Sequence, residues 1–337
     1  MKRHNVKAIL PQVTGELLPI SLEDEEEIWQ RAVKQFNKLK AQMAIAEKRR
    51  IRFEHGPIAL CFGADLHLGG AGVDYERIER ELKLIAGTPN MYLALLGDLI
   101  DNFILPKLVH ARWDSTVTPS EEWILLRRTL RLVIIKLLLS VGGNHEGWIS
   151  ALTGIDLFKD EVEQVKQNRT LIYDYADIIF RLQVGRAEFP IRLRHKWSGS
   201  SIYNLTHGIE RSQKWDQNFL IGVGAHTHAS GACRGFDAGG KLGMAVLCGS
   251  YKVYDRHARA GGFAQPNGST IQTIIFFEDG TYFGIENLEL AVQVMRVVSE
   301  SPELGKALTL VLDDQKKQWQ MPKKTTATKA RRYREER

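Results

Sequence analysis

The sequence predicts an α/β fold built around two packed sheets. Strand and helix patterns alternate through the first half of the chain, which is typical of a layered α/β core. In the second half, strand patterns follow one another with few helices between them. Four of the apolar strand patterns run into glycine and then Asp, His or Asn, as in GADLHLGG and GAHTHAS, and a fifth, IRLRH, ends directly in His. Two mixed sheets, one begun in each half, are the simplest architecture.

The composition indicates a globular, intracellular protein. Of the 337 residues, 44% are hydrophobic and 26% charged, which suits one large domain with extensions. The three cysteines, Cys61, Cys233 and Cys248, are too few and too scattered for a disulfide framework or a cysteine zinc site. No apolar run of signal-peptide length opens the chain, and the longest apolar stretch contains Lys136. We expect no membrane segment and a cytoplasmic location.

Four regions are expected along the chain. Residues 1–54 form an N-terminal helical arm, in which Ser21 caps a helix with an acidic first turn. Residues 55–288 form the catalytic domain, 289–320 a helical C-terminal extension, and 321–337 a basic disordered tail. Apolar residues of the arm recur every three or four positions, so one face packs on something. The terminal helices can serve oligomerisation, partner docking or simple core packing, and the tail can grip nucleic acid or be merely solvated.

The core elements are expected in a fixed order. Strands 57–65, 91–98 and 136–144 are separated by helices 75–87 and 120–134. A further helix covers 156–167. The remaining strands lie in 171–185, 189–195, 219–226, 241–250 and 270–284, and Asp279-Gly280 turns the last of these into a hairpin.

Metal-binding side chains lie where these strands end. The carboxyl ends of strands in an open α/β sheet face one crevice, so residues far apart in sequence can meet there. Oxygen and imidazole ligands of this kind supply a two-metal hydrolytic centre. Any one of these short motifs arises often by chance, or serves as a helix cap or turn. Their order and completeness favour the metal centre: Asp65 and His67, Asp98, Asn144 with His145, His195, then His226 and His228.

At these residues the chain resembles the calcineurin-like metallophosphoesterase superfamily, whose pattern is D-x-H, G-D-x-x-D, G-N-H-D/E, a single His and G-H-x-H. The resemblance covers roughly Ile58 to Gly284. It implies a four-layer α/β/β/α sandwich and a phosphoesterase that acts through a metal-bridging hydroxide. Two divalent ions are implied, with Mn²⁺ expected and Fe or Zn²⁺ as alternatives.

The resemblance also assigns roles residue by residue. One metal takes Asp65, His67 and His228; the other takes Asn144, His195 and His226. Asp98 bridges both. His145 is the catalytic residue that protonates the leaving oxygen or steadies the phosphoryl group. Asp101 is expected to orient a neighbouring histidine rather than to bind metal.

Two departures and one ambiguity bear on this assignment. Ala225 stands where the pattern has glycine, and Asn102 follows Asp101 where the family often has an arginine that binds phosphate. The single-histidine position is filled by His195, which ends a strand, or by His207, twelve residues later. We choose His195, which leaves His207 at the rim of the site, contacting phosphate or nothing.

The substrate is predicted only by class. The favoured substrate is DNA, cut by a phosphodiesterase similar to the DNA-repair exonuclease branch. Three features support it: the net charge of +6, the cationic tail, and a weaker likeness of HKWSGSSIYNLTHG to phage-encoded members of the superfamily. Cations that could line a phosphate track and aromatics that could stack bases lie near the later motifs: Arg211, Lys214, Arg234, Lys252, Arg256 and Arg259, with Trp197, Tyr203 and Trp215. Solvated cations and buried aromatics are the plainer alternatives. A phosphomonoesterase on phosphoprotein or a small metabolite is the second hypothesis, and a non-catalytic scaffold the third.

Overall fold

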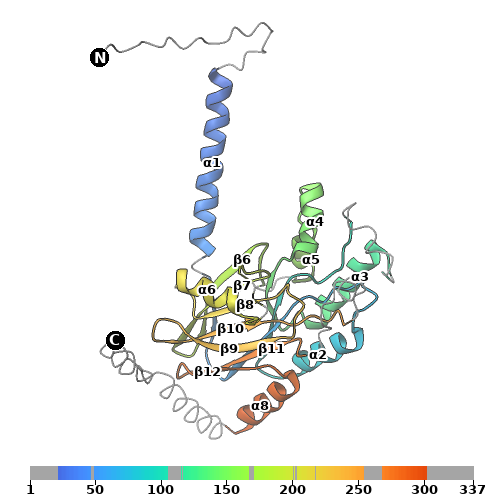
Figure 1. The fold of residues 1–337 in the computed structure, drawn as a ribbon, viewed down its shortest axis with the longest axis vertical. Helices are drawn as coiled ribbons and strands as arrows, with labels where there is room; N and C mark the ends of the chain where they lie inside the picture. Colours follow the sequence, from blue (N-terminus) through green and yellow to red (C-terminus); the bar gives the residue numbers. More distant parts are fainter. Residues whose placement is uncertain are drawn as a thin grey trace, which may run out of the picture. The chain divides into compact units, whose positions relative to one another are not determined.

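A computed structural model describes residues 22–46, 49–104, 115, 117–166, 171–199, 201, 203–216, 218–253 and 268–301. The chain divides into two compact units, Met1–Glu47 and Lys48–Arg337. The first contains the helix α1 (Leu22–Ala46), with its apolar residues Ile28, Phe36 and Met43 exposed. The second contains two six-stranded sheets and the remaining helices (Figure 1). The basic tail predicted at 321–337 lies outside the described residues.

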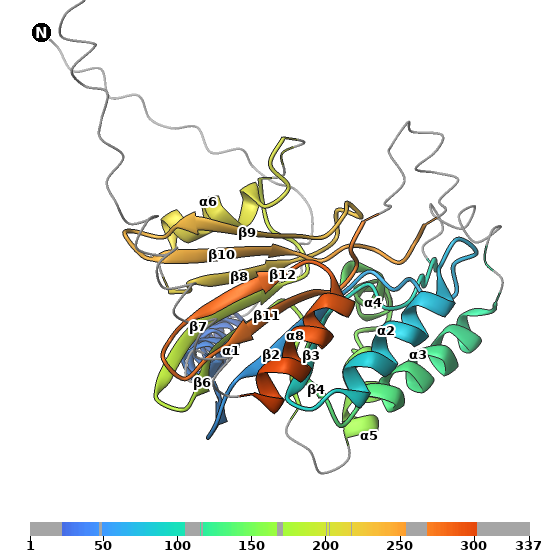
Figure 2. The same ribbon diagram turned by 90° about the horizontal axis from the view of Figure 1, so that it is seen from below.

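The first sheet carries the predicted alternation of strands and helices. Its strand order is β12-β11-β2-β3-β4-β5, and β2 (Ile58–Gly63), β3 (Met91–Leu96), β4 (Leu137–Val141) and β5 (Ile172–Asp174) run parallel. The antiparallel strands β11 (Gln272–Phe276) and β12 (Tyr282–Ile285) complete it. One face is covered by α2 (Tyr75–Gly87), α3 (Pro119–Val133), α5 (Leu157–Lys166) and α8 (Leu288–Glu300), as Figure 2 shows.

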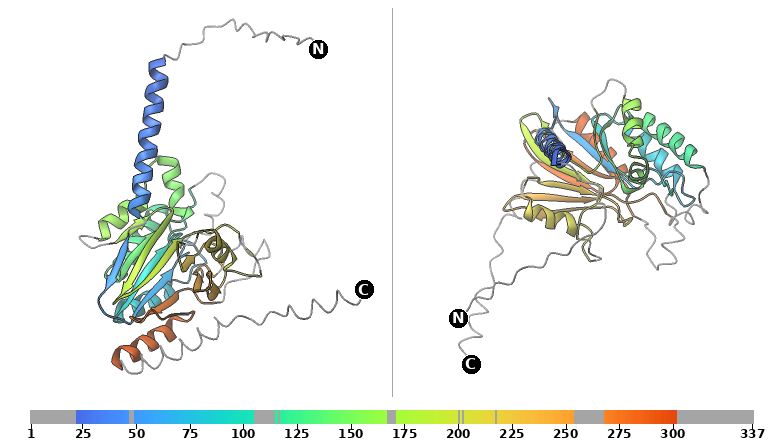
Figure 3. Two further views of the ribbon diagram at one scale, coloured as in Figure 1. Left: turned by 90° about the vertical axis from the view of Figure 1, so that its left-hand side faces the viewer. Right: turned by 90° about the horizontal axis from the view of Figure 1, so that it is seen from above.

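The second sheet has the order β1-β6-β7-β8-β10-β9. Its strands are β1 (Arg50–Phe53), β6 (Asp177–Val184), β7 (Ala187–Arg194), β8 (Ile221–Gly224), β9 (Ala232–Asp237) and β10 (Leu242–Leu247). The helix α6 (His207–Trp215) packs on its outer face through Ile209, against Phe219 and Phe236 (Figure 3). Helix, sheet, sheet and helix therefore form the expected four layers.

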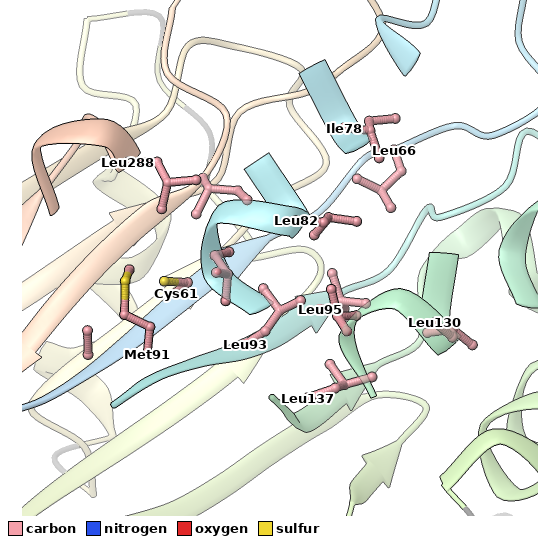
Figure 4. Packing of buried hydrophobic residues seen from close by; sticks show 14 of the residues in the cluster. Cys61, Leu66, Ile78, Leu82, Met91, Leu93, Leu95, Leu130, Leu137 and Leu288 are labelled. Carbon is pink, nitrogen blue, oxygen red and sulfur yellow. The ribbon is translucent and has the colours of Figure 1, made fainter. Parts of the chain in front are cut away.

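Two apolar layers hold this sandwich together. Between the helices and the first sheet, Leu82 of α2 and Leu130 of α3 pack on Leu93 and Leu95 of β3 (Figure 4). Between the two sheets, both faces are apolar: Leu60 and Leu96 from one sheet belong to the same buried cluster as residues of the other, among them Ile191, Val223 and Val246. Because β2 and β3 are buried on both faces, their sequences are continuous apolar runs rather than alternating ones.

Local sequence signals explain where the covering helices begin. Asp74 caps α2 by accepting the N–H of Arg77, and Asn287 caps α8 by accepting that of Leu290. In α3, Thr118 and Glu121 form a reciprocal capping box with a proline at the helix start. The helices α2 and α3 match the predicted ranges within a residue, because capping and 3.6-residue periodicity agree there. The helix α8 begins one residue before the extension predicted at 289–320, and residues 302–320 lie outside the described residues.

Four elements were not predicted. The helix α4 (Asn144–Thr153) begins inside the GNHE motif, where glycine and short polar residues mask the helical pattern. The stretch 171–185, expected as one strand, is two strands in different sheets. Strand β9 was not anticipated, and β1 lies within the range expected for the helical arm. Edge strands carry weak signals because only one neighbour and little burial constrain their composition.

A charge cluster joins β6 to β7 at the edge of the inner core. Asp177 on β6 accepts hydrogen bonds from Arg192 and Arg194 on β7, at 2.6 Å and 2.7 Å from their Nη2 atoms. Partial burial of Asp177 acts to raise its pKa, but the two guanidinium groups outweigh burial and hold the pKa below its usual value.

None of the helices in the described part of the chain combines the length and the apolar composition that a membrane span requires.

Candidate metal centre

The predicted ligand residues, which follow the carboxyl ends of strands, lie close together in the structure. Asp65 and His67 follow β2, Asp98 follows β3 and Asn144 follows β4, all in the parallel part of the first sheet. His195 follows β7, and His226 and His228 follow β8, a parallel pair in the second sheet. The site therefore lies where the carboxyl ends of strands from both sheets meet.

The first group of donors contains Asp65, His67, Asp98 and His228. One ligand atom from each lies within 4.8 Å of all the others. The Nε2 atoms of His67 and His228 are 2.8 Å apart, and Asp65 Oδ1 is 3.9 Å and 3.6 Å from them. Asp65, His67 and Asp98 are almost fully buried, while His228 is half-buried.

The second group contains Asp98, His195 and His226. His195 Nε2 lies 3.1 Å from Asp98 Oδ2 and 3.2 Å from both Asn144 Oδ1 and His226 Nδ1. Its other ring nitrogen, Nδ1, donates to the carbonyl oxygen of Leu96 at 2.6 Å, which leaves Nε2 to face the cluster. Asp98 is thus common to both groups.

Two features of the chain fit divalent metal ions in these groups. Asp65 Oδ1 is buried and accepts no hydrogen bond, although it faces two imidazole nitrogens. Such an orphaned oxygen is costly unless a cation satisfies it. His67 donates from Nδ1 to Asp101, so its Nε2 presents a lone pair to the same space. One carboxylate oxygen and imidazole nitrogens are donors that Mn²⁺, Fe and Zn²⁺ all accept.

The electrostatics of the metal-free chain point the same way. Burial acts to lower the pKa of His195, but its hydrogen bond to Asp98 and the charge of that carboxylate outweigh burial and raise the pKa to about 9. For Asp98, burial acts to raise the pKa, yet the surrounding histidines hold it well below its usual value. In the metal-free chain, the proton on His195 therefore balances the negative charge of Asp98, which metal cations would otherwise balance.

The backbone at the site adopts a conformation that few residues accept. Among the described non-glycine residues with positive φ, five are the proposed ligands Asp65 (50°), His67 (48°), Asp98 (51°), His226 (74°) and His228 (51°). Asn102 (44°) is also in the site, and Asn90 lies in a turn. Strained backbone held by its surroundings is a mark of functional sites.

Close packing of two loops requires glycine at two positions. A Cβ on Gly97 would lie 2.4 Å from the amide nitrogen of Gly143, and one on Gly143 would lie 2.2 Å from Asp98 Oδ1. Either side chain would push Asp98 away from the shared position. By contrast, the backbone of Ala225, where the family pattern has glycine, has no positive φ. Its N–H donates to the carbonyl of His195, so alanine is tolerated there.

His145 lies beside the two groups. Its backbone N–H donates to Asp98 Oδ1 at 3.0 Å, and its Nδ1 donates to the carbonyl oxygen of Asp101. Its Nε2 is therefore free to face Asp98 Oδ2, 3.8 Å away. Burial lowers the pKa of His145 to about 4. The negative charge of a bound phosphate would favour the protonated ring.

Asp101 joins His67 to Lys252, a lysine expected from sequence to contact phosphate. Its Oδ1 accepts from His67 Nδ1 at 2.9 Å, which is the geometry expected of an orienting carboxylate. Lys252 Nζ donates to both carboxylate oxygens, at 3.0 Å and 3.2 Å. These contacts outweigh the effect of burial and lower the pKa of Asp101 to about 2. A cation therefore lies beside Asp101 even though the next residue is Asn102 and not arginine.

The segment Cys248–Val253 that carries Lys252 is held from several sides. Tyr251 N–H and Ser250 Oγ both donate to the carbonyl of Asp65, at 3.1 Å each. The fully buried hydroxyl of Tyr251 donates to Glu81 on α2, which Thr270 also contacts at 2.7 Å. These contacts could not be predicted from sequence, because their members come from distant segments that form no motif.

The remaining predicted residues lie apart from the cluster. His207 is exposed at the start of α6 and makes no contact with the donor groups among the described residues, whereas His195 contacts Asp98, His226 and Asn144. Trp197 packs beside Phe219 and donates its indole N–H to the carbonyl of Val223, so it serves the core. Tyr203 and Trp215 are strongly exposed. Arg256 and Arg259 lie outside the described residues.

No protein-family model and no curated protein matches the chain. Three solved structures to which it is similar are Vacuolar Protein Sorting 29 from Cryptosporidium parvum, nuclease MPE from Pseudomonas putida, and a conserved uncharacterized protein, described as a predicted phosphoesterase, from Streptococcus pneumoniae. The first is 14% identical, with a TM-score of 0.34, and the match covers 68% of this chain and 96% of that one.

The other two matches are of the same order. The nuclease is 13% identical over 67% of this chain and 87% of its own, with a TM-score of 0.32. The predicted phosphoesterase is 11% identical over 69% of this chain and 99% of its own, with a TM-score of 0.30. Likenesses this low carry no conclusion about the activity of the chain.

Proposed function

We propose that this chain is a dinuclear-metal phosphoesterase, and within that class a phosphodiesterase that cuts nucleic acid. The observation that carries the proposal is the sharing of Asp98 by two donor groups, with His145 Nε2 facing the same carboxylate. A lone structural metal needs neither a shared carboxylate nor a free imidazole beside it.

The proposed ligand sets follow the two groups. Asp65, His67 and His228 would hold one ion, and Asn144, His195 and His226 the other, with Asp98 between them. When bound, a pair of divalent ions lowers the pKa of a water and neutralises charge on the phosphoryl oxygens. The rim of the site is formed by the half-buried side chains of Asn144, His226 and His228, so the substrate would approach from there.

His145 has the geometry for a role separate from metal binding. Its Nδ1–H is fixed on the carbonyl of Asp101, so only Nε2 can meet the substrate. In its protonated form, Nε2–H would donate to the departing oxygen or to a phosphoryl oxygen, whereas in the neutral ring Nε2 offers only a lone pair. Lys252 keeps Asp101 ionised, which keeps the proton of His67 on Nδ1.

A phosphodiester substrate is favoured over a monoester by charge. The chain carries a net charge of +6. Lys252, the cation beside the site, is already paired with Asp101 and so is not free to bind the second negative charge of a monoester. A nucleic acid carries one negative charge at each diester along a long backbone, and a chain of positive net charge can neutralise several of these phosphates. Support for nucleic acid therefore comes from overall charge rather than from an identified groove.

The test is a metal-dependent screen of phosphoesters. Wild type loaded with Mn²⁺ should hydrolyse bis(p-nitrophenyl) phosphate and single-stranded DNA, and it should act poorly on p-nitrophenyl phosphate and on a phosphopeptide. Activity on the monoesters alone would favour the phosphomonoesterase instead. A protein that retains no metal after loading, or that is inactive on every ester, would point to a scaffold with this fold.

A further inference from the structure

Two aromatic side chains flank His145 and have no part in the apolar core. Trp148 lies one helical turn after His145 on α4, with ring centroids 4.1 Å apart. Phe103, five residues after Asp98, lies 5.2 Å from the His145 ring and 5.7 Å from that of Trp148. Both are partly exposed, whereas His145 is only 8% exposed.

These rings differ from the other aromatic residues near the site. Neither Phe103 nor Trp148 belongs to any of the three apolar clusters that the described residues form. Trp197, by comparison, packs against the cluster under α6 and has its indole N–H satisfied. Large apolar rings left half in solvent beside a reactive side chain are typical of ligand contacts rather than of packing.

The position of the rings limits what they can contact. A departing group must bring its oxygen to His145 Nε2, so the rest of that group lies near the side chains around the imidazole. Phe103 is also under a cation, since Lys252 Nζ is 5.0 Å from its ring centroid. Partly exposed aromatic faces close to a cation are the features on which unpaired nucleobases stack in single-strand binding sites.

We propose that Phe103 and Trp148 form a stacking site for the nucleobase of the nucleotide that departs with the oxygen at His145. The proposal rests on the proposed phosphodiesterase function and narrows its substrate to nucleic acid with an unpaired base at that position. Stacking on aromatic side chains is independent of base identity, so the site selects for a base without reading which one it is.

The experiment compares two dinucleotides that differ by one base. Thymidylyl-thymidine and its analogue with an abasic tetrahydrofuran residue on the leaving side have the same phosphodiester. Wild type with Mn²⁺ should favour the intact dinucleotide by about 10-fold or more in kcat/KM. Trp148→Ala should remove most of that preference by slowing the intact substrate, while the abasic one changes less than about twofold. Trp148→Phe should restore part of the preference, and Phe103→Ala should reduce it.

Trp29→Ala is the matched control, because Trp29 is an exposed tryptophan on α1 to which no role in binding is assigned. It should leave the preference unchanged. Equal rates of wild type on the two dinucleotides would overturn the proposal. So would an equal loss on both substrates in Trp148→Ala, since that result would mean that the ring only supports His145.

A binding measurement separates this proposal from the proposed function. In EDTA, anisotropy of a labelled single-stranded oligothymidylate should show weaker binding when abasic residues replace the bases, and the difference should shrink in Trp148→Ala. Equal affinity for both oligonucleotides overturns the stacking site whatever the activity. Base-dependent binding by a protein that cleaves only monoesters would instead overturn the phosphodiesterase and leave the stacking site standing.

Discussion

The carboxylate of Glu146 accepts the backbone N–H of Asp98 at 3.0 Å, although the two residues lie 48 positions apart in the chain. It also accepts the N–H groups of Leu99 and Gly143, at 2.6 Å and 2.9 Å. The fourth residue of the GNHE motif thus fixes the loop that presents the shared carboxylate. Burial, together with the charge of Asp98, raises the pKa of Glu146 to about 7.

Glu146→Gln should destabilise the protein and weaken metal binding. A carboxamide has one oxygen acceptor, so at least one backbone N–H in this buried turn loses its partner, at a cost of about 1–3 kcal/mol in the free energy of unfolding. Chemical denaturation with and without Mn²⁺ measures both effects. Glu27→Gln, at an exposed position of α1, is the control and should change neither. An unaltered stability in Glu146→Gln would contradict the bracing role.

Asp98→Asn should abolish the binding of both ions, because the residue belongs to both donor groups. Metal content by mass spectrometry should fall well below that of wild type, and activity should fall at least 10³-fold, since transition-state stabilisation by the metal pair is lost. Asp160→Asn, an exposed carboxylate on α5, should behave as wild type. Retention of a full metal complement would refute the shared-ligand arrangement.

His145→Ala should separate catalysis from metal binding. The side chain faces the donor groups without belonging to either proposed ligand set, so metal content should stay near the wild-type value. The rate should fall about 10²- to 10⁴-fold, as expected for loss of a proton donor. His207→Ala is the control and should retain full activity. A variant that loses its metal together with its activity would make His145 a ligand instead.

Lys252→Met should act through Asp101 and His67. Without the lysine, the carboxylate loses two hydrogen bonds, and the tautomer of His67 that presents Nε2 is less strongly favoured. Loss of such an orienting partner typically weakens metal affinity 10- to 100-fold. Calorimetric titration with Mn²⁺ measures this directly, and Lys252→Arg should recover part of the affinity. Equal affinities in wild type and Lys252→Met would show that Lys252 acts on substrate alone.

Asp177→Asn should lower stability at neutral pH and flatten its acid dependence. The pKa of Asp177 is depressed in the folded state, so its stabilisation is complete above the unfolded-state pKa of about 3.9 and is lost as the pH falls through the lower native value. We expect a loss of about 1–3 kcal/mol at pH 7 in urea unfolding. The difference from wild type should shrink towards pH 3. A difference independent of pH would exclude the ion pairs as its cause.

The convergence of the donor residues could be predicted from sequence because each lies within four residues of a strand end. A strand that ends in glycine and a polar residue fixes both position and direction, and parallel strands bring those positions together. The choice of His195 over His207 used the same rule. The strand–helix alternation up to Val141 was predicted for a similar reason, since capping residues and periodicity agreed in each element.

Other parts of the site had no local signal. Lys252 and Tyr251 reach the cluster only because β10 runs beside β8, a pairing that no short motif records. Phe103 and Trp148 lie inside motif neighbourhoods, but their side-chain directions depend on the loop after β3 and on α4, which was not predicted. Glu146 was recognised as part of a pattern, while its backbone contacts require knowing which loops meet.

The left-handed backbone at the ligand positions also restricts which amino acids can serve there. Asp, Asn and His adopt this conformation several times more readily than other side chains, and Asp65, His67, Asp98, His226 and His228 all come from that set. Glutamate and cysteine can bind the same ions but are disfavoured at such angles. The backbone conformation of the loops therefore limits which residue types can occupy the ligand positions, in addition to any preference of the metal. Replacing Asp or His there by glutamate or cysteine to change the metal preference would first strain the main chain.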